Sequence, residues 1–281
     1  IAARSPLPLV ADIHFDYRLA IAAAEGGAAK IRINPGNIGG EAHVRAVADC
    51  CRAHHIPIRI GVNGGSLEKG LLEKYGHPTP EALVESAFSH IRMLEDVGFG
   101  DICVSMKSSN VPLMMQAYRL MHERSDYPLH VGVTETGTEY MGTIKSAMGI
   151  GGLLCLGIGD TIRVSLTADP VREVVAAKAI LKAAGLRKQG VNLISCPTCG
   201  RTKIDLIGLA NRVQEALQDC DKELTVAVMG CVVNGPGEAR EADIGIAGGD
   251  GCGVLFVHGE LKEKLPYDEL LPALLRYIDA M

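Results

Sequence analysis

Three cysteines in the last third of the chain have a spacing that suits metal chemistry. Cys196 and Cys199 form a Cys-Pro-Thr-Cys motif, and Cys231 lies in a glycine-rich segment, Gly-Cys-Val-Val-Asn-Gly-Pro-Gly-Glu, that ends at Glu238. Both motifs follow strand-like runs, and in a parallel arrangement two neighbouring strand ends lie side by side. The three thiolates can therefore converge, while the glycines let the backbone wrap closely around a bulky group.

Several chemistries fit three converging thiolates, and they differ in the ligands they need. A zinc site takes four ligands, usually as two Cys or His pairs, and the second pair is missing. A thioredoxin-type motif would not need Cys231. A four-iron four-sulfur cluster takes four ligands, and Glu238 could supply a displaceable fourth one beside three cysteines. We favour the cluster; zinc or thiol redox chemistry and buried structural cysteines are the alternatives.

Charged and amide side chains at or just past the ends of apolar runs form a second group, nearer the N-terminus. The cations are Arg32, Arg59, Lys107 and Arg163, and their companions are Asp12, His14, Asn63, Glu135 and Ser165. Cations gathered at one mouth are costly without an anion, and Arg matches phosphate oxygens in pairs. We therefore expect a strongly anionic ligand such as a diphosphate, with Glu135 as the available acid or base. The alternative is a set of separate strand-end ion pairs and solvated charges.

Alternating strand-like and helix-like runs must position these residues. Six short apolar runs precede helix-like stretches in the first part of the chain, at 7–13, 29–33, 58–62, 101–106, 129–133 and 161–165. The clearest helices are predicted at 41–54, 79–97 and 169–184, the second with Thr79 as its cap and Pro80 in its first turn. Strands that alternate with helices indicate parallel pairing, and active sites of barrels lie at the carboxyl ends of their strands.

The number of these units defines the expected fold class and domains. Residues 1–187 are predicted to form a (β/α) TIM-type barrel with six of its eight βα units. An open dinucleotide-binding sheet is less favoured, because no G-x-G-x-x-G motif follows any of the six strands. Since the chain begins with Ile1 and not Met, we expect the two missing units to precede it. Residues 188–281 are predicted to form a smaller α/β domain, with strands at 192–195, 224–228, 244–247 and 253–257 and helices at 205–217 and 267–280.

Composition limits the function classes further. The chain has 281 residues, a formal net charge of −5 and 4% aromatic residues without Trp, which argues against nucleic-acid binding. The longest apolar run, 148–159, is shorter than a membrane span. Nine cysteines, an odd number, suit a reducing compartment better than a secreted disulfide framework, so a cytoplasmic protein is expected.

Six motifs together resemble one enzyme family, hydroxymethylbutenyl diphosphate synthase of the methylerythritol phosphate route to isoprenoids. They are Ala-Asp-Ile-His-Phe-Asp at 11–16, Arg-Ile-Asn-Pro-Gly-Asn-Ile-Gly at 32–39, Pro-Ile-Arg-Ile-Gly-Val-Asn at 57–63, Gly-Asp-Thr-Ile-Arg-Val-Ser-Leu at 159–166, and the two cysteine motifs. The resemblance runs in order over nearly the whole chain. It implies a barrel joined to a four-iron four-sulfur domain, and a two-electron reductive opening and dehydration of 2-C-methyl-D-erythritol 2,4-cyclodiphosphate.

The resemblance also implies roles for individual residues. The cluster ligands would be Cys196, Cys199, Cys231 and Glu238. The diphosphate would be held by Arg32, Arg59, Asn63, Lys107, Arg163 and Ser165, with Asp12 and His14 in the same mouth and Glu135 as proton donor. The implied partners are flavodoxin or ferredoxin and a second copy of the chain in a homodimer. Competing hypotheses are a non-catalytic iron–sulfur electron carrier on a degenerate, truncated barrel, and a phosphate-binding barrel with a structural zinc domain.

Overall fold

A computed structural model describes residues 1–231 and 241–281, which form two compact units, Ile1–Leu186 and Arg187–Met281. Six parallel strands run through the first unit in chain order: β1 (Val10–Asp12), β2 (Lys30–Ile33), β3 (Ile58–Asn63), β4 (Ile102–Lys107), β5 (His130–Val131) and β6 (Thr161–Ile162). β1 to β4 form one sheet and β5 pairs with β6. A parallel bridge between Val104 and Leu129 joins the two groups. All six predicted strands are present.

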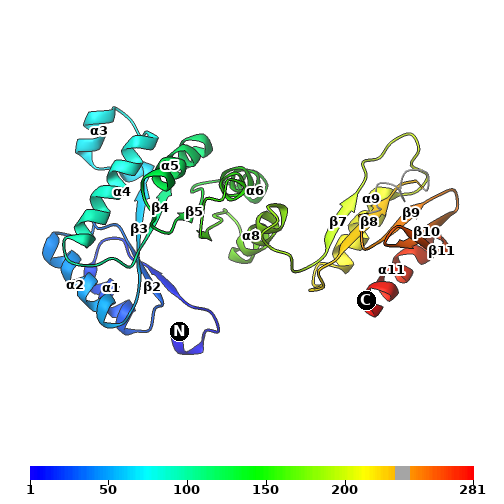
Figure 1. Ribbon diagram of the computed structural model, residues 1–281, viewed down its shortest axis with the longest axis horizontal. Coiled ribbons are helices and arrows are strands. Elements are labelled where there is room, and N and C mark those ends of the chain that lie inside the picture. Colours follow the sequence, from blue (N-terminus) through cyan, green and yellow to red (C-terminus); the bar gives the residue numbers. More distant parts are fainter. Residues whose placement is uncertain (232–240) are drawn as a thin grey trace. The chain divides into compact units, whose positions relative to one another are not determined.

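Helices follow the strands and complete the alternation (Figure 1). The helical segments of the first unit are η1 (Ala2–Arg4), α1 (Tyr17–Glu25), α2 (Glu41–Ala53), η2 (Gly64–Ser66), α3 (Lys69–Tyr75), α4 (Pro80–Glu95), α5 (Val111–Arg124), α6 (Glu139–Ser146), η3 (Ala147–Gly151), α7 (Gly152–Cys155) and α8 (Pro170–Ala183). The three clearest helix predictions are confirmed. Thr79 caps α4 by accepting a hydrogen bond from the Ala82 N–H at 3.1 Å.

The core of the first unit lies between the sheet and these helices. Alternate strand residues such as Ile31, Ile58 and Val104 are fully buried against helical side chains. Tyr118 on α5 reaches the strands, where its hydroxyl accepts from the Met106 N–H at 2.9 Å and donates to the His130 carbonyl at 2.6 Å. It thereby links β4 to β5 where a single backbone bridge joins them.

The apolar run predicted to be too short for a membrane span forms the π-helical turn η3 and the short helix α7. In the part of the chain that is described, no helix has both the length and the apolar character to cross a bilayer.

The second unit is a five-stranded mixed sheet. Its elements are β7 (Asn192–Ser195), α9 (Leu206–Ala216), β8 (Thr225–Met229), β9 (Ile244–Gly248), β10 (Cys252–Val257), β11 (Glu260–Pro266), η4 (Tyr267–Glu269) and α11 (Leu270–Ala280). The strand order is β11-β10-β9-β8-β7, with β7, β8 and β9 parallel and the last two strands antiparallel. Side chains of α9 and α11, such as Leu209 and Leu274, fill its core.

Strand β11 is the element that the sequence pattern did not indicate. Its sequence, Glu-Leu-Lys-Glu-Lys-Leu-Pro, is charged, and most of its residues are exposed. It pairs only with β10, at the edge of the sheet, where charged side chains are usual. Hydrophobic patterning misses such a strand because little of it is buried.

Candidate active site

Strand register gathers the predicted cations on the sheet face opposite the helices. Arg32 on β2 is the cross-strand partner of Arg59 on β3, and Arg59 is in turn the partner of Cys103 on β4. Two pleats further along, Asn63 pairs with Lys107. The interior of an ordinary barrel is packed with bulky branched residues, whereas these inward positions are polar or positively charged. The inner face of this sheet is therefore built to contact something other than hydrocarbon.

Arg32 is held across the inner face by residues of two neighbouring strands and a loop. Its Nη1 atom forms an ion pair with Asp12 Oδ1 at 2.8 Å and lies 3.5 Å from His14 Nδ1, and its Nη2 donates to the Gly61 carbonyl at 3.3 Å. A Cβ atom at Gly61 would overlap the guanidinium, so only glycine at this position lets Arg32 lie where it does. Arg32 is 8% exposed, yet its Nε has no hydrogen-bond partner.

Arg59 and Lys107 are as deeply buried, at 8% and 5% exposure. Burial lowers the pKa of Lys107 to about 7, and the positive charges of Arg163, Arg32 and Arg59 add to the effect. Burial also lowers the pKa of Arg59, whose Nε is without a hydrogen-bond partner. Buried like charges with unsatisfied donors are costly unless an anion offsets them. The three cations thus form a buried, positively charged surface on which an anion would be stabilised.

Asp12 offsets part of this charge. Burial acts to raise its pKa, but the ion pair and hydrogen bond with Arg32, assisted by Lys107, outweigh burial and hold the pKa below its usual range. Among the residues that the structure describes, Asp12 is the one carboxylate in an ion pair with the predicted cations. The net charge of the inner face is therefore positive.

Two further inward residues, Ser105 and His130, were missed by the reasoning from strand ends. Burial, together with the charges of Arg59 and Lys107, lowers the pKa of His130 to about 3, so this imidazole is neutral. Its Nδ1 lies 2.8 Å from Thr161 Oγ1, while its Nε2 and the buried Ser105 Oγ have no hydrogen-bond partner. The alternation of apolar and polar residues along β4 is the sequence signal that could have identified Ser105.

Arg163, Ser165 and Glu135 lie in the loops that follow β6 and β5. Arg163 Nη2 is 3.4 Å from Ser165 Oγ. Glu135 has a φ of 53°, in the left-handed region that a non-glycine residue adopts only when its surroundings hold it there. The two loops are tied together because the Thr136 hydroxyl donates to the Ser165 carbonyl and the Thr167 N–H donates to the Gly137 carbonyl at 2.9 Å.

A pocket of about 390 Å³ lies at the carboxyl ends of β3, β4 and β5. Asn63 and Glu135 line it, beside Ser108 and Thr134, which the sequence reasoning did not select. Asn63 and Lys107 are cross-strand partners, so the pocket adjoins the cationic face. The candidate proton donor and the candidate anion site thus lie at one end of the sheet.

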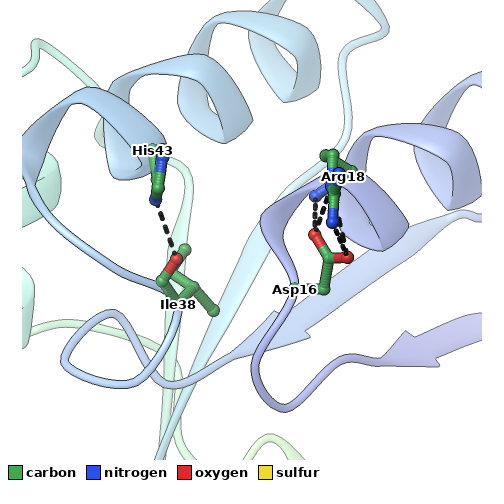
Figure 2. A network of polar contacts seen from close by, with 4 residues as sticks. All are labelled: Asp16, Arg18, Ile38 and His43. Carbon is green, nitrogen blue, oxygen red and sulfur yellow. Dashed lines mark hydrogen bonds and ion pairs between the residues drawn. The ribbon is translucent and has the colours of Figure 1, made fainter.

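The loops after β1 and β2 are stiffened by local contacts at the same end of the sheet, as Figure 2 shows. Asp16 caps α1 through the Arg18 N–H at 3.0 Å and binds the Arg18 guanidinium with both carboxylate oxygens. His43 Nδ1 lies 3.3 Å from the Ile38 carbonyl, and its ring stacks on Tyr17 at 4.1 Å. These contacts fix the loop that carries His14.

In the second unit, the predicted juxtaposition of two strand ends is present. Ser195 on β7 is the partner of Val228 on β8, so Cys196 and the segment that begins with Gly230 leave the same sheet edge. The Gly230 N–H donates to Cys196 Sγ at 3.2 Å. Backbone and side-chain hydrogen bonds from Arg201 lower the pKa of the exposed Cys199 thiol, which favours its thiolate form.

The three predicted thiolates are not assembled into a metal site in the described part of the chain. Within residues 1–231 and 241–281, no three His, Cys, Asp or Glu side chains are placed to hold one metal ion. Glu238, the predicted fourth ligand, lies outside the described residues. The structure therefore places Cys196 beside Gly230, the residue that precedes Cys231. The cluster assignment stays a prediction.

Fold and site together define a class: a (β/α) barrel protein with a cationic inner face and an additional α/β unit that carries cysteines at one sheet edge. Comparison with known proteins gives the family. Residues 1–178 match the GcpE TIM-barrel domain, and residues 192–280 match the GcpE protein C-terminal domain. The chain belongs to the 4-hydroxy-3-methylbut-2-en-1-yl diphosphate synthase family, as the sequence motifs predicted, and the barrel fold class is confirmed.

Curated relatives with the name 4-hydroxy-3-methylbut-2-en-1-yl diphosphate synthase (flavodoxin) match over almost the whole chain. The protein of Clostridium perfringens is 60% identical over 281 residues, which are 100% of this chain and 80% of that protein. The protein of Geobacter sulfurreducens is 58% identical over 99% of this chain and 79% of its own length. The protein of Caldanaerobacter subterraneus is 61% identical over 98% of this chain and 78% of its own length.

Proposed function

We propose that this chain catalyses the reductive opening of 2-C-methyl-D-erythritol 2,4-cyclodiphosphate to 4-hydroxy-3-methylbut-2-enyl diphosphate. The reaction takes up two electrons and two protons, breaks a carbon–oxygen bond of the ring and releases one water. The observation that carries the proposal is the inner face of the barrel, where Arg32, Arg59 and Lys107 are buried and two guanidinium Nε atoms have no partner. A diphosphate supplies the charge and the acceptors that this face needs. The names of the relatives support the same product.

The diphosphate is assigned to the inner face and the rim. Arg32 and Arg59 offer forked donors, and Lys107 offers a compact charge between them. Asp12 and His14 orient Arg32 through its Nη1 atom. The rim residues Asn63, Arg163 and Ser165 complete the predicted set, since Asn63 pairs with Lys107 and Arg163 contributes to the field at Lys107.

Glu135 is proposed as the proton donor to the reacting carbon. Its carboxyl group is at the pocket that Asn63 also lines, and the ties between the β5 and β6 loops fix its backbone. A donor held by its backbone needs little reorganisation during the reaction, which is the condition for efficient general acid catalysis. Residues 1–187 are thus assigned to substrate binding and proton transfer.

Residues 188–281 are proposed to hold a four-iron four-sulfur cluster through Cys196, Cys199, Cys231 and Glu238. The shared sheet edge and the lowered pKa of Cys199 fit this assignment, because metal ligands must be thiolates. When bound, the cluster would supply electrons one at a time and Lewis-acid chemistry. Flavodoxin, named for the relatives, is the proposed electron donor, with ferredoxin as the alternative. A cytoplasmic homodimer is proposed as the working form.

A non-catalytic electron carrier would keep the cysteines but has no use for buried cations that outnumber their counterions. A phosphate-binding barrel with structural zinc would keep the cations, but zinc usually takes four ligands as two Cys or His pairs, and the sequence offers one such pair and Cys231. The conjunction of both features favours the synthase.

Anaerobic reconstitution with iron and sulfide tests the proposal. We expect a brown protein that absorbs near ~400 nm and converts the cyclic diphosphate when reduced methyl viologen or flavodoxin is added. Colour without turnover would favour the electron carrier. A colourless protein that binds one zinc ion per chain would exclude both cluster functions.

A further inference from the structure

Two paired side chains, the buried His90 and the half-buried Glu68, lie behind the rim of the barrel and outside the site described above. His90 on α4 is 2% exposed, and its Nε2 lies 2.9 Å from Oε1 of Glu68, the residue that caps α3. Ser86, one turn earlier on α4, donates its hydroxyl to the same oxygen at 3.0 Å. Since a carboxylate accepts hydrogen bonds, Nε2 must carry the proton of the imidazole.

This pair touches the loop after β2. A Cβ atom built on Gly36 would lie 2.9 Å from His90 Nε2, so the imidazole edge packs directly against the backbone of that residue. The Gly36 N–H donates to Asn34 Oδ1 at 3.1 Å, and the Asn37 N–H donates to the Asn34 carbonyl at 2.9 Å. The loop is thus a tight turn folded around the buried Asn34, with His90 as its support.

The pair also anchors the segment after β3. Glu68 is separated from Asn63 by the short helix η2 and Leu67. Asn63 Oδ1 accepts a hydrogen bond from the Gly65 N–H at 3.3 Å at the start of that helix. Hydrogen bonds from His90 and Ser86 therefore hold one end of a segment whose other end orients the Asn63 amide. The side chain of His90 stands between the two segments that border the inner face at β2 and β3.

The contact between His90 and Glu68 differs from an ordinary surface bridge because His90 is buried. The hydrogen bond from His90 is the main reason that the pKa of Glu68 falls to about 2. The His90 Nδ1 and Glu68 Oε2 atoms are buried without hydrogen-bond partners, which is a cost that packing alone does not require. A hydrophobic side chain on α4 would fill the same space without that cost.

We propose that His90 and Glu68 are positioning residues that hold the loops bearing Asn34 and Asn63 in one arrangement for the phosphate groups of the substrate. This inference rests on the proposed function for the identity of the ligand, and on the geometry alone for the coupling of the two loops. His90 itself does not touch the substrate; it acts through the backbone at Gly36 and through Glu68.

Three variants of the full chain test the proposal. His90→Ala removes the support and the hydrogen bond. His90→Gln keeps an N–H donor at a similar distance from the backbone and restores the bond to Glu68. Glu85→Gln is the matched control, because Glu85 on the same helix pairs with Lys74 Nζ at 2.7 Å and so also joins α3 to α4, away from the loops.

Hydrogen exchange at the Gly36 and Asn37 amides is the first measurement, and it needs no ligand. We expect His90→Ala to speed exchange there by at least ~10-fold, with His90→Gln near wild type and Glu85→Gln unchanged. The second measurement is turnover by the reconstituted enzyme, in which His90→Ala should raise KM about 10-fold and change kcat by less than about 2-fold.

The outcomes separate the two proposals. Unchanged exchange in His90→Ala, or an equal change in Glu85→Gln, overturns the coupling of the loops. Faster exchange with an unchanged KM overturns the positioning role. An inactive wild-type enzyme would count against the proposed function, while the exchange data would still decide whether His90 supports the loop. If His90→Ala does not fold, Ser86→Ala removes one of the two hydrogen bonds to Glu68 and should give a smaller increase in exchange.

Discussion

The barrel mouth, with its buried cations, and the cysteine edge, with its three predicted cluster ligands, differ in how the fold holds their side chains. Arg32, Arg59 and Lys107 belong to strands, so the backbone ladder of the sheet fixes where each side chain starts. Cys196, Cys199 and Cys231 stand just past strand ends, in segments held by a few local hydrogen bonds such as that from the Gly230 N–H. The fold thus holds the side chains of the first site in place without a ligand. In the described residues the cysteines do not form a metal site, so a bound group would have to draw them together.

The two regions also differ in what they contribute to the free energy of unfolding. Burying three cations on one face costs stability, which the apolar core on the other face of the same strands offsets. At the cysteine edge, Cys199 is exposed and Cys196 and Cys231 are only partly buried. Removing a cation from the mouth should therefore change affinity and stability in opposite directions, whereas removing a cysteine should change only the cofactor and the activity.

The largest effect is expected at the cysteine edge. Cys196→Ser should prevent cluster assembly and lower turnover at least ~100-fold, because a metal ligand is lost, while affinity for the cyclic diphosphate stays unchanged. Absorbance near ~400 nm, iron content and calorimetric titration check this. Cys155→Ser, at an exposed cysteine of the other unit, is the control that should keep its colour. Full colour in Cys196→Ser would remove that residue from the ligand set.

The second-largest effect tests whether the buried cations of the barrel mouth destabilise the free protein. Arg59→Met should weaken binding of the cyclic diphosphate by ~10- to 100-fold, the value of one to two charge-assisted hydrogen bonds. The thermal midpoint of the free protein should rise by a few degrees, because a buried positive charge without a full set of partners is removed. Arg45→Met, which breaks an exposed pair with Glu41, is the control and should change neither quantity. A lower midpoint in Arg59→Met would show that the cation stabilises the fold.

A pH effect follows from Lys107. In the free protein its pKa is about 7, and a bound anion raises that value. Below pH 6 the amine is protonated with or without ligand, so affinity is constant; above pH 7 binding takes up a proton, and affinity falls by up to ~10-fold per pH unit. Titration calorimetry at pH 8 in two buffers of different ionisation enthalpy measures this uptake. Lys107→Met should abolish it, and the absence of proton uptake in the wild type would contradict a lowered pKa.

The smallest effect concerns the glycine beneath Arg32. Gly61→Ala introduces a methyl group where the Arg32 guanidinium lies, so we expect a loss of ~1–3 kcal/mol in stability and a several-fold loss in affinity. Gly70→Ala is the control, since nothing lies within 4 Å of a Cβ there. Chemical denaturation and titration with the cyclic diphosphate measure both quantities. Equal behaviour of the two variants would mean that Arg32 adjusts freely and is not preorganised.

Reasoning from strand ends identified Arg32 and Arg59 as candidate ligands but did not predict how the sheet brings them together. Both residues lie inside their strands and not past them, and it is their shared inward face that groups them. Ser105 and His130 lie on that face as well. The alternation along β4 indicates Ser105, whereas the strand of His130 is too short to show a period. Gly61 could not be recognised at all, because its role is to leave space for a side chain 29 residues away.

The sequence by itself determined the alternation of elements, the division of polar and apolar positions along each strand, the cysteine motifs and the family. These properties depend on residues close together in the chain, where period and spacing are visible. The tertiary structure alone decided that Arg32 lies over Gly61, that Asp12 is its counterion, and that His90 meets both Gly36 and Glu68. The physical reason is that such contacts join different strands and helices, and only the register between those elements brings the side chains together.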